Sequence, residues 1–359
     1  MRQCHLNRVV FRQHDGLIWT YLNPYLYCKP VVMKHLTILV PEGENNLSSI
    51  VGAYKIFTRA NAYRKQAGKK EVFNIELAGI SGQVDFYDGL FTARPHKHVA
   101  AINKTDLVIV PSLNHNYQQA IKLNGELIDW ISKQYRNGTC IASICTGAYL
   151  LAAAGLLDGK NCSTHWSAAD QLKQLYPKIN LQTDRLITDE QGIYTNGGAY
   201  SFLNLIIYLV EKYYDRETAI YCSKVFQIEM DRQSQSSFII FKGQRAHGDE
   251  LVKKAQTYIE SKLDEKISIE HLAASFAVGR RNFDRRFIKA TGNTPTEYAQ
   301  RVKIEAAKKA FETSRKTVNE VMYEVGYADL KAFREVFRRI TGFSPLEYRG
   351  RYNHDAAVG

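Results

Sequence analysis

The stretch Thr139–Ala154 reads TCIASICTGAYLLAAA and decides the fold of the larger part of the chain. Its first half is a short apolar run, and its second half is a helix-length run rich in alanine and leucine. A single residue, Cys145, separates the halves, so the chain passes from strand to helix through a sharp turn. Gly147 permits close contact between such a helix and the strand. The stretch therefore predicts a strand, an elbow at Cys145 and a helix.

The same alternation extends from residue 34 to about residue 230. Short apolar runs predict strands, and longer amphipathic stretches between them predict helices. The predicted strands are Leu36–Val40, Val72–Ala78, Leu107–Val110 and Cys140–Ile144. The predicted helices include Ser49–Arg64 and Gln118–Tyr135. We therefore expect an α/β domain, a flavodoxin-like parallel sheet flanked by helices, with ligands bound at the carboxyl ends of the strands.

Cys145 occupies the position of a nucleophile in this pattern. At the elbow its sulfur is expected to be exposed at the edge of the sheet, close to the first amides of the next helix. Both features lower the pKa of a thiol and make it nucleophilic. His165, in Thr164-His-Trp166, is a candidate base or orienting group for Cys145. A buried structural cysteine beside a core histidine is the alternative, and both interpretations stay open.

The last third of the chain contains an internal repeat of fifty residues. The shift aligns eight identical pairs: Phe283 and Phe333, Phe287 and Phe337, Thr291 and Thr341, Gly292 and Gly342, Pro295 and Pro345, Glu297 and Glu347, Tyr298 and Tyr348, Arg301 and Arg351. Each copy predicts a helix, a short turn and a second helix. The helix pairs are Ile269–Phe276 with Arg280–Ala290, and Val318–Val325 with Asp329–Ile340. This order predicts an all-α domain with two helix-turn-helix units.

The second helix of each unit is basic. Arg280–Lys289 carries five positive charges and one negative charge, and Lys331–Arg339 carries four positive charges and one negative charge. A basic helix alone is usually a solvated face, but the second helix of a helix-turn-helix unit is the one that enters the major groove. Three capping boxes mark further helix starts. They are Thr294–Glu297, Thr317–Glu320 and Ser344–Glu347.

Composition agrees with a polyanionic partner and excludes other classes. The 359 residues include 48 Lys and Arg against 36 Asp and Glu, a net charge of +12. Half of this excess lies beyond residue 244, where 22 basic and 16 acidic residues give +6. No apolar run reaches the roughly 18 residues of a membrane span. The six cysteines show no CxxC pair, so we expect reduced cytoplasmic thiols and no metal site.

Residues 34 to 230 resemble the PfpI-type, glutamine-amidotransferase-like fold, and more closely its non-enzymatic branch in GlxA-type transcriptional regulators. The motifs are Ala142-Ser-Ile-Cys-Thr-Gly-Ala148, Ala154-Gly-Leu-Leu-Asp-Gly159, Thr164-His-Trp166 and Thr195-Asn-Gly-Gly198. Hydrolytic relatives have a Glu near the start of the first helix and a Pro-Gly-Gly oxyanion turn. Here these positions hold Ser48 or Ser49 and Pro111-Ser112-Leu113. The resemblance implies a ligand pocket without catalytic residues or cofactor, formed by Cys145, Thr146, His165, Ser112, Leu113 and Ser49.

Residues 250 to 351 closely resemble the AraC-type DNA-binding domain, whose two helix-turn-helix units are joined by a long helix, here Pro295–Thr313. The Gly326-Tyr327 turn and the Ser344-Pro345 ending carry this likeness. The resemblance implies that base edges are contacted in two groove segments about 34 Å apart. The residues expected at the DNA are Arg280, Arg281, Asp284, Arg285, Lys331 and Arg334. Arg280 is expected at a phosphate rather than at a base.

These expectations combine into one organisation. We expect an extension at 1–33, a sensor domain at 34–230, a linker at 231–248, the DNA-binding domain at 249–351 and a tail at 352–359. The predicted function is a cytoplasmic transcriptional regulator that binds double-stranded DNA and senses a small metabolite. The resemblance to GlxA-type regulators implies a homodimer and a nitrogenous effector. A contact with RNA polymerase is left open. The alternatives are a PfpI-type cysteine hydrolase or amidase with an appended DNA-binding domain, and a thiol redox sensor.

Overall fold

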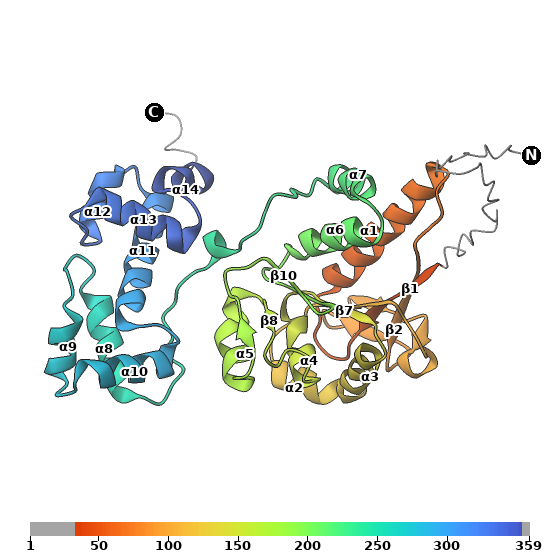
Figure 1. Ribbon diagram of the computed structural model, residues 1–359, viewed down its shortest axis with the longest axis horizontal. Helices are drawn as coiled ribbons and strands as arrows, with labels where there is room; N and C mark the ends of the chain where they lie inside the picture. The colour runs from red at the N-terminus through yellow and green to blue at the C-terminus, as the bar shows by residue number, and fades with distance from the viewer. Residues whose placement is uncertain (1–32, 354–359) are drawn as a thin grey trace, which may run out of the picture. The chain divides into compact units, whose positions relative to one another are not determined.

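The computed structural model describes residues 33–353. The predictions for residues 1–32 and 354–359 lie outside the described residues. The described chain contains an α/β part built around one large sheet and a part built of helices alone (Figure 1). Among residues 33–353, no helix is long and apolar enough to cross a membrane. The predicted fold class is confirmed for both parts.

The large sheet has seven strands in the order β10-β11-β7-β6-β1-β2-β5. Their bounds are β1 Lys34–Val40, β2 Phe73–Gly79, β5 Lys97–His98, β6 Leu107–Val110, β7 Cys140–Ser143, β10 Ile187–Glu190 and β11 Ile193–Asn196. Neighbouring strands are parallel, except for the antiparallel pair β10 and β11 at one edge. The four predicted strands are β1, β2, β6 and β7, with bounds that shift by two residues at most. Their carboxyl ends lie at one edge, as parallel pairing requires.

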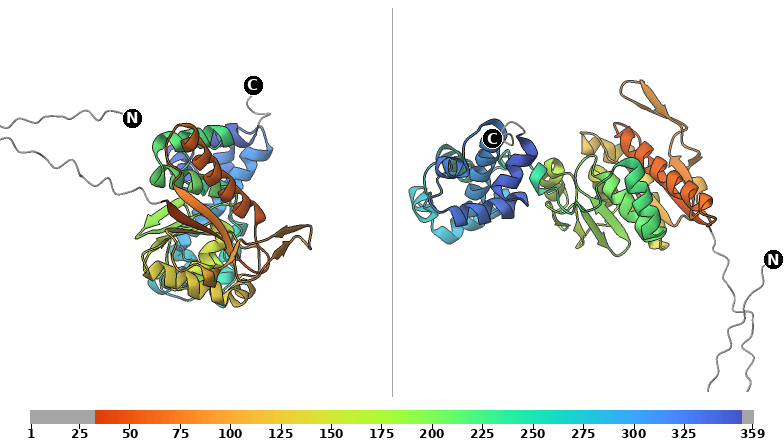
Figure 2. Two further views of the ribbon diagram at one scale, coloured as in Figure 1. Left: turned by 90° about the vertical axis from the view of Figure 1, so that its right-hand side faces the viewer. Right: turned by 90° about the horizontal axis from the view of Figure 1, so that it is seen from above.

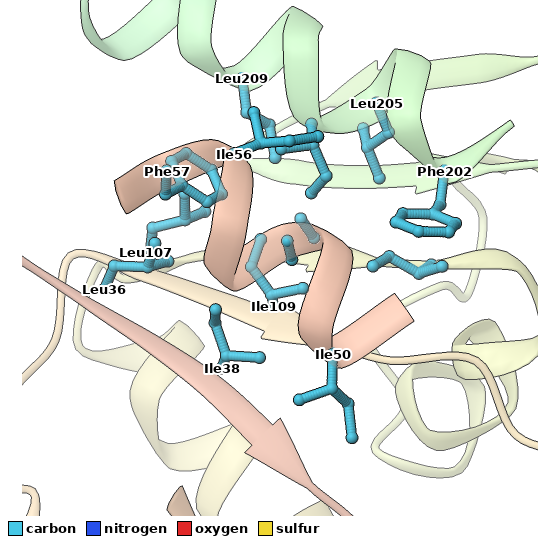
Figure 3. Packing of buried hydrophobic residues seen from close by; sticks show 14 of the residues in the cluster. Leu36, Ile38, Ile50, Ile56, Phe57, Leu107, Ile109, Phe202, Leu205 and Leu209 are labelled. Atoms are coloured by element: carbon cyan, nitrogen blue, oxygen red, sulfur yellow. The ribbon is translucent and has the colours of Figure 1, made fainter. Parts of the chain in front are cut away.

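Helices cover both faces of the sheet (Figures 1 and 2). One face carries α1 Leu47–Gln66, α6 Phe202–Tyr213 and α7 Arg216–Phe226, and the other carries α2 Tyr117–Leu123, α3 Gly125–Arg136, α4 Ala148–Ala153 and α5 Ala169–Leu175. Figure 3 shows Phe57 of α1 and Leu205 of α6 packed above Ile38 and Ile109 of the sheet. Alternate residues of each strand therefore pack into two separate hydrophobic cores, one on each face of the sheet.

The predicted helix Gln118–Tyr135 is in fact two helices, α2 and α3. Asn124 lies between them, and its side-chain amide donates to the carbonyls of Ala120 at 2.8 Å and Glu42 at 3.0 Å. Its Oδ1 accepts from the backbone N–H of Glu42 at 2.8 Å. A buried asparagine that bonds the backbone competes with helical hydrogen bonding. The prediction of a single helix is wrong because it used local sequence alone, whereas Glu42, the partner of Asn124, lies 82 residues away.

A two-stranded hairpin, β3 Val84–Phe86 and β4 Phe91–Ala93, projects from the α/β part (Figure 2). The hairpin exposes three large hydrophobic side chains, those of Tyr87 and Leu90 in its turn and Phe91 at the start of β4. A second short pair, β8 Asn161–Cys162 and β9 Asn180–Leu181, is parallel. These small sheets lie outside the seven-stranded sheet.

The helical part has two small cores. Its helices are α8 Glu250–Ser261, α9 Ile269–Ser275, α10 Arg280–Thr291, α11 Pro295–Thr313, α12 Val318–Glu324, α13 Leu330–Thr341 and α14 Pro345–Tyr352. The first core lies among α8, α9, α10 and the start of α11, and the second among the rest of α11, α12, α13 and α14. The two predicted helix-turn-helix pairs are α9 with α10 and α12 with α13. The predicted long helix Pro295–Thr313 is confirmed as α11.

Residues that repeat at a distance of fifty have matching structural roles. Tyr298 packs edge-on against Phe287 at 5.3 Å between ring centroids, and Tyr348 packs edge-on against Phe337 at 5.5 Å. All three predicted capping boxes are confirmed by their reciprocal hydrogen bonds. The repeat therefore records two copies of one packing unit.

Candidate functional site

Cys145 forms the sharp turn after β7. Its φ of +54° lies in the left-handed region that non-glycine residues seldom adopt. Gly147 lies so close to the end of β6 that an added Cβ would meet the carbonyl oxygens of Val110 and Pro111 at 2.7 and 2.6 Å. The backbone N–H of Cys145 donates to Oδ1 of Asn196, just at the end of β11, at 2.9 Å. The predicted elbow is present, and both neighbouring strands hold it.

The structure brings together the six residues that the sequence assigned to one pocket. The Oγ of Ser112 and the Oγ1 of Thr146 lie 2.9 Å apart, and the backbone N–H of Ser112 donates to Oγ of Ser49 at 3.2 Å. Thr146 Oγ1 also donates to the carbonyl of Leu113 at 2.5 Å. We call this group the Cys145 cluster: Ser49, Ser112, Leu113, Cys145, Thr146 and His165. It lies at the carboxyl ends of the central strands, where α/β sheets bind ligands.

The Cys145 thiol is buried rather than exposed. The residue is 4% exposed, and burial raises the pKa of its thiol. Ser112, Thr146 and the backbone of His165 offer hydrogen bonds that favour the thiolate, but these contacts are outweighed. The expectation of an exposed sulfur with a lowered pKa is therefore wrong. Desolvation of the charged form is the physical reason.

The ring of His165 is turned to its own chain segment. Its Nδ1 accepts from the backbone N–H of Ser167 at 3.2 Å and lies 2.7 Å from the Oγ of Ser167. Burial lowers the pKa of this imidazole. Within residues 33–353 no hydrogen bond joins the ring to Cys145. His165 reaches the thiol through its backbone, so the arrangement lacks the oriented base of a nucleophilic pair.

Three further residues belong to this site. Asn196 binds the Cys145 amide, and Thr164 donates its hydroxyl to the Cys145 carbonyl at 3.0 Å. Both lie in motifs that marked the family resemblance, so their positions, though not their contacts, were visible in the sequence. The third residue, Gln235, lies in the predicted linker. Nothing in its sequence context indicated a role, because its partners are distant in the chain.

Gln235 is fully buried against the loop that carries His165. Its Nε2 donates to the carbonyls of Thr164 at 2.9 Å and Thr183 at 2.7 Å. An added Cβ on Gly197 would lie 2.1 Å from that Nε2, so only glycine leaves room for the amide. The Oε1 of Gln235 has no hydrogen-bond partner among the described residues. The first part of the linker is therefore anchored to Thr164, the residue that precedes His165 of the Cys145 cluster.

The helix α10 presents some of its basic residues and uses others internally. Arg281 and Arg285 are exposed, and Arg285 makes one contact, to Oδ1 of Asn282 at 3.0 Å. Arg280 instead binds both oxygens of Asp284 at 2.9 Å and pairs with Glu270 of α9. Of the predicted DNA contacts on this helix, Arg281 and Arg285 are thus available, whereas Arg280 and Asp284 are paired with each other.

The helix α13 presents the matching surface in the second unit. Lys331 and Arg334 are exposed, and neither forms an ion pair within the described residues. At a shift of fifty, Lys331 corresponds to Arg281 and Arg334 corresponds to Asp284. Each unit therefore exposes a cation near the start of its second helix, the end that contacts bases in helix-turn-helix proteins.

Lys303 of α11 ties the two units together. Its ammonium is buried and donates to the carbonyls of Glu265, before α9, at 2.8 Å and Val325, after α12, at 3.0 Å. Gly326 has φ +69°, and an added Cβ would lie 2.6 Å from Nζ of Lys303. A buried charge needs such partners. This contact was not predicted, because a lysine in a long helix normally indicates a solvated face.

Comparison with known proteins identifies both parts of the chain. A DJ-1/PfpI family model matches residues 50–212, and a helix-turn-helix domain model matches residues 272–351. The α/β part is therefore similar to the DJ-1/PfpI family, and the helical part contains a helix-turn-helix domain. This combination confirms the predicted resemblance to the GlxA-type regulators of the AraC family. The α/β part is called the DJ-1/PfpI domain, and the helical part is called the helix-turn-helix domain.

Curated relatives include three transcriptional regulators. The HTH-type transcriptional regulator GbdR of Pseudomonas aeruginosa is 25% identical over 225 residues, which are 62% of this chain and 61% of GbdR. CdhR of the same species is 25% identical over 250 residues, 69% of this chain and 73% of CdhR. GlxA of Rhizobium meliloti is 26% identical over 241 residues, 63% and 73% of the two chains. The chain thus spans less than two thirds of the length of GbdR.

Among solved structures, an AraC family transcriptional regulator from Pseudomonas putida is 18% identical and has a TM-score of 0.43. The match covers 54% of this chain and 99% of that chain.

Among residues 33–353, no group of three His, Cys, Asp or Glu residues could hold a metal ion.

Proposed function

We propose that the protein is a sequence-specific, DNA-binding transcriptional regulator whose DJ-1/PfpI domain senses a small molecule. One observation carries the proposal: two copies of one helix-turn-helix unit expose unpaired cations at matching positions, Arg281 and Lys331. In such units the start of the second helix enters the major groove of double-stranded DNA. The named regulators among the relatives support the same function.

We assign base contacts to the second helix of each unit and a phosphate contact to Arg280. Arg281 and Arg285 are free to hold guanine in one groove segment, and Lys331 and Arg334 read the next segment. Arg280 stays near the phosphates, where its pair with Asp284 fixes the side chain. Each phosphate contact contributes to the salt dependence of binding, and each base contact contributes to discrimination.

Effector sensing is assigned to the Cys145 cluster and its surroundings. The resemblance to GlxA-type regulators favours a nitrogenous metabolite and a cytoplasmic homodimer. A ligand acts only through different affinity for two conformations of the chain. Gln235 supports such coupling, because it anchors the linker to Thr164, which is bonded to Cys145 and adjoins His165. A shift of that loop would displace the segment that leads to the helix-turn-helix domain.

A regulatory role is favoured over a catalytic one. A hydrolase needs an activated nucleophile together with free oxyanion donors. Here burial raises the pKa of Cys145, and its backbone N–H is already bound by Asn196. Ser48 or Ser49 stands where hydrolytic relatives have a carboxylate. The PfpI fold also occurs in enzymes, so the test is turnover of amide and ester substrates by the full chain and by Cys145→Ala. Turnover that needs Cys145 would contradict the non-enzymatic role.

The DNA-binding proposal is tested by selection of bound sequences from random double-stranded DNA. The full chain is expected to enrich one motif, and fluorescence anisotropy then gives the affinity for it. Arg281→Ala should lower affinity for the motif by about tenfold, as expected for loss of a good base contact. Lys178→Ala, which removes an exposed cation of the DJ-1/PfpI domain, is the charge-matched control. Absence of any enriched motif, or equal losses in both variants, would contradict the proposal.

A further inference from the structure

A cavity of about 350 Å³ lies at the β10 edge of the DJ-1/PfpI domain. Its walls come from β10, from α6 and the start of α7, and from residues 230–233, which lead out of the domain. No residue of the Cys145 cluster lines it. Small-molecule sites have volumes of about 300 to 1,000 Å³, so one small ligand fits here. The cavity is a candidate site that is separate from Cys145.

The acidic groups of this cavity are already neutralised. Asp189 accepts from Nζ of Lys212 and from the hydroxyl of Tyr208, both at 2.5 Å. Glu211 accepts from Arg216 with both oxygens, at 2.9 and 2.7 Å. The carboxylates therefore have their own cations, and the remaining charges of the wall determine which ligand it accepts.

Two guanidinium groups of the wall have no acidic partner. The ion pairs of arginines within residues 33–353 do not include Arg185 or Arg232. Arg232 is partly buried, and its Cζ lies 4.2 Å from the ring centroid of Phe238. Its Nε donates to the carbonyl of Ser234 at 3.4 Å, which leaves the positive charge without an anion. Partial burial makes an unpaired cation unfavourable, and a bound anion would remove that cost. Guanidinium binds planar carboxylates through two parallel hydrogen bonds.

Part of the remaining wall is apolar, and Asn204 and Gln233 add polar groups to it. Leu186 and Ile207 are buried, and Met230 is partly buried beside them. A ligand that meets both the arginines and this surface has a charged end and a short hydrocarbon body. Inorganic anions satisfy only the first of these conditions.

The cavity also adjoins the point where the linker joins the sheet. Arg185 forms an antiparallel bridge with Ser234, and the N–H of Leu186 donates to the carbonyl of Gln233 at 3.1 Å. The N–H of Gln235 donates to the carbonyl of Asp184 at 3.0 Å. Arg185 thus lies on the strand side of this junction, and Arg232 lies on the linker side. A ligand bound to both would favour the docked linker.

We propose that this cavity is an effector site for a small carboxylate with a short apolar body. Binding to Arg185 and Arg232 holds residues 232–235 against the sheet edge and so favours one state of the linker. The regulatory consequence of this inference rests on the proposed sensing function. Binding of the carboxylate itself is tested without DNA.

The test is isothermal titration of the full chain with butanoate and with phenylacetate, each compared with its neutral amide. We expect saturable binding of at least one acid and about tenfold weaker binding of its amide, since the charge-assisted bonds are lost. Arg185→Gln and Arg232→Gln should each weaken binding of the acid about tenfold. Lys178→Gln, which removes an exposed cation that does not line the cavity, should leave binding unchanged. Hydrogen exchange of the Leu186 and Gln235 amides should slow when the acid binds.

Equal binding of acid and amide, equal weakening by Lys178→Gln and the two arginine variants, or no binding of either acid would overturn the proposal. Failure of the DNA-binding proposal is seen separately, because sequence selection is carried out without any acid. A chain that binds its DNA motif but neither acid refutes the cavity site alone. A chain that binds the acid but no DNA refutes only the regulatory consequence.

Discussion

At Cys145, hydrogen-bond donors from Ser112, Thr146 and His165 favour the thiolate, while burial of the side chain favours the neutral thiol. Burial prevails, and the pKa of the thiol rises. The same elbow geometry would support a nucleophile if the sulfur were solvated and a base faced it. The ring of His165 instead binds Ser167. The chemistry of this position is thus decided by its surroundings rather than by the turn itself.

This pKa predicts how stability depends on pH. A thiol whose pKa is higher in the folded state keeps its proton after the unfolded thiol has lost it at about pH 8.5. The free energy of unfolding therefore falls as pH rises above about 8.5. Cys145→Ala removes this contribution, so its stability should fall less steeply than that of the wild type between pH about 7 and about 9.5. Urea unfolding followed by tryptophan fluorescence measures both slopes. Identical slopes would refute the raised pKa.

At the scale of single elements, much of the fold was predictable from sequence. The bounds of α11 and the three capping boxes follow from local signals at Pro295, Thr317 and similar residues. What could not be predicted depends on partners far along the chain. Asn124 divides a helix by binding Glu42, and Gln235 enters the α/β core from the linker. The burial of Cys145 could not be predicted for the same reason, because the residues that cover it come from several separate segments of the chain.

The contact of α11 with both helix-turn-helix units predicts a stability effect. Lys303→Met removes the donor to the carbonyls of Glu265 and Val325 and leaves both unpaired. We expect a loss of about 1 to 3 kcal/mol in the free energy of unfolding. Lys309→Met, at an exposed position of the same helix, is the matched control and should change stability by less than about 0.5 kcal/mol. Urea unfolding followed by far-UV circular dichroism compares them, and equal stabilities would refute the contact.

At the scale of the whole molecule, the linker joins the two domains through specific contacts rather than as a free tether. Gln235 is buried in the DJ-1/PfpI domain, while Lys308 of α11 donates to the carbonyl of Ile239 and Glu305 accepts from the N–H of Phe241. Only three residues lie between Gln235 and Ile239. A change at the Cys145 cluster therefore has a short path along the chain to the helix-turn-helix domain.

A double-mutant cycle tests the contact by which Gln235 anchors the linker. Gly197→Ala places a Cβ 2.1 Å from Nε2 of Gln235 and should expel the amide, which costs about 1 to 3 kcal/mol. Gln235→Ala should cost a similar amount. Because both changes break the same contact, the double variant should lose at least about 1 kcal/mol less than the sum. Tryptophan fluorescence suits the measurement, since Trp130 and Trp166 lie in the DJ-1/PfpI domain. Strict additivity would show that the two residues act independently.

The central claim is that two copies of one unit read two segments of a DNA site. The most direct measurement is hydroxyl-radical footprinting of the full chain on its selected motif, repeated with Arg281→Ala and Lys331→Ala. We predict two protected segments whose centres lie about one helical turn apart, with each variant losing protection mainly in one segment. A single segment, or protection that both variants reduce equally everywhere, would contradict the account.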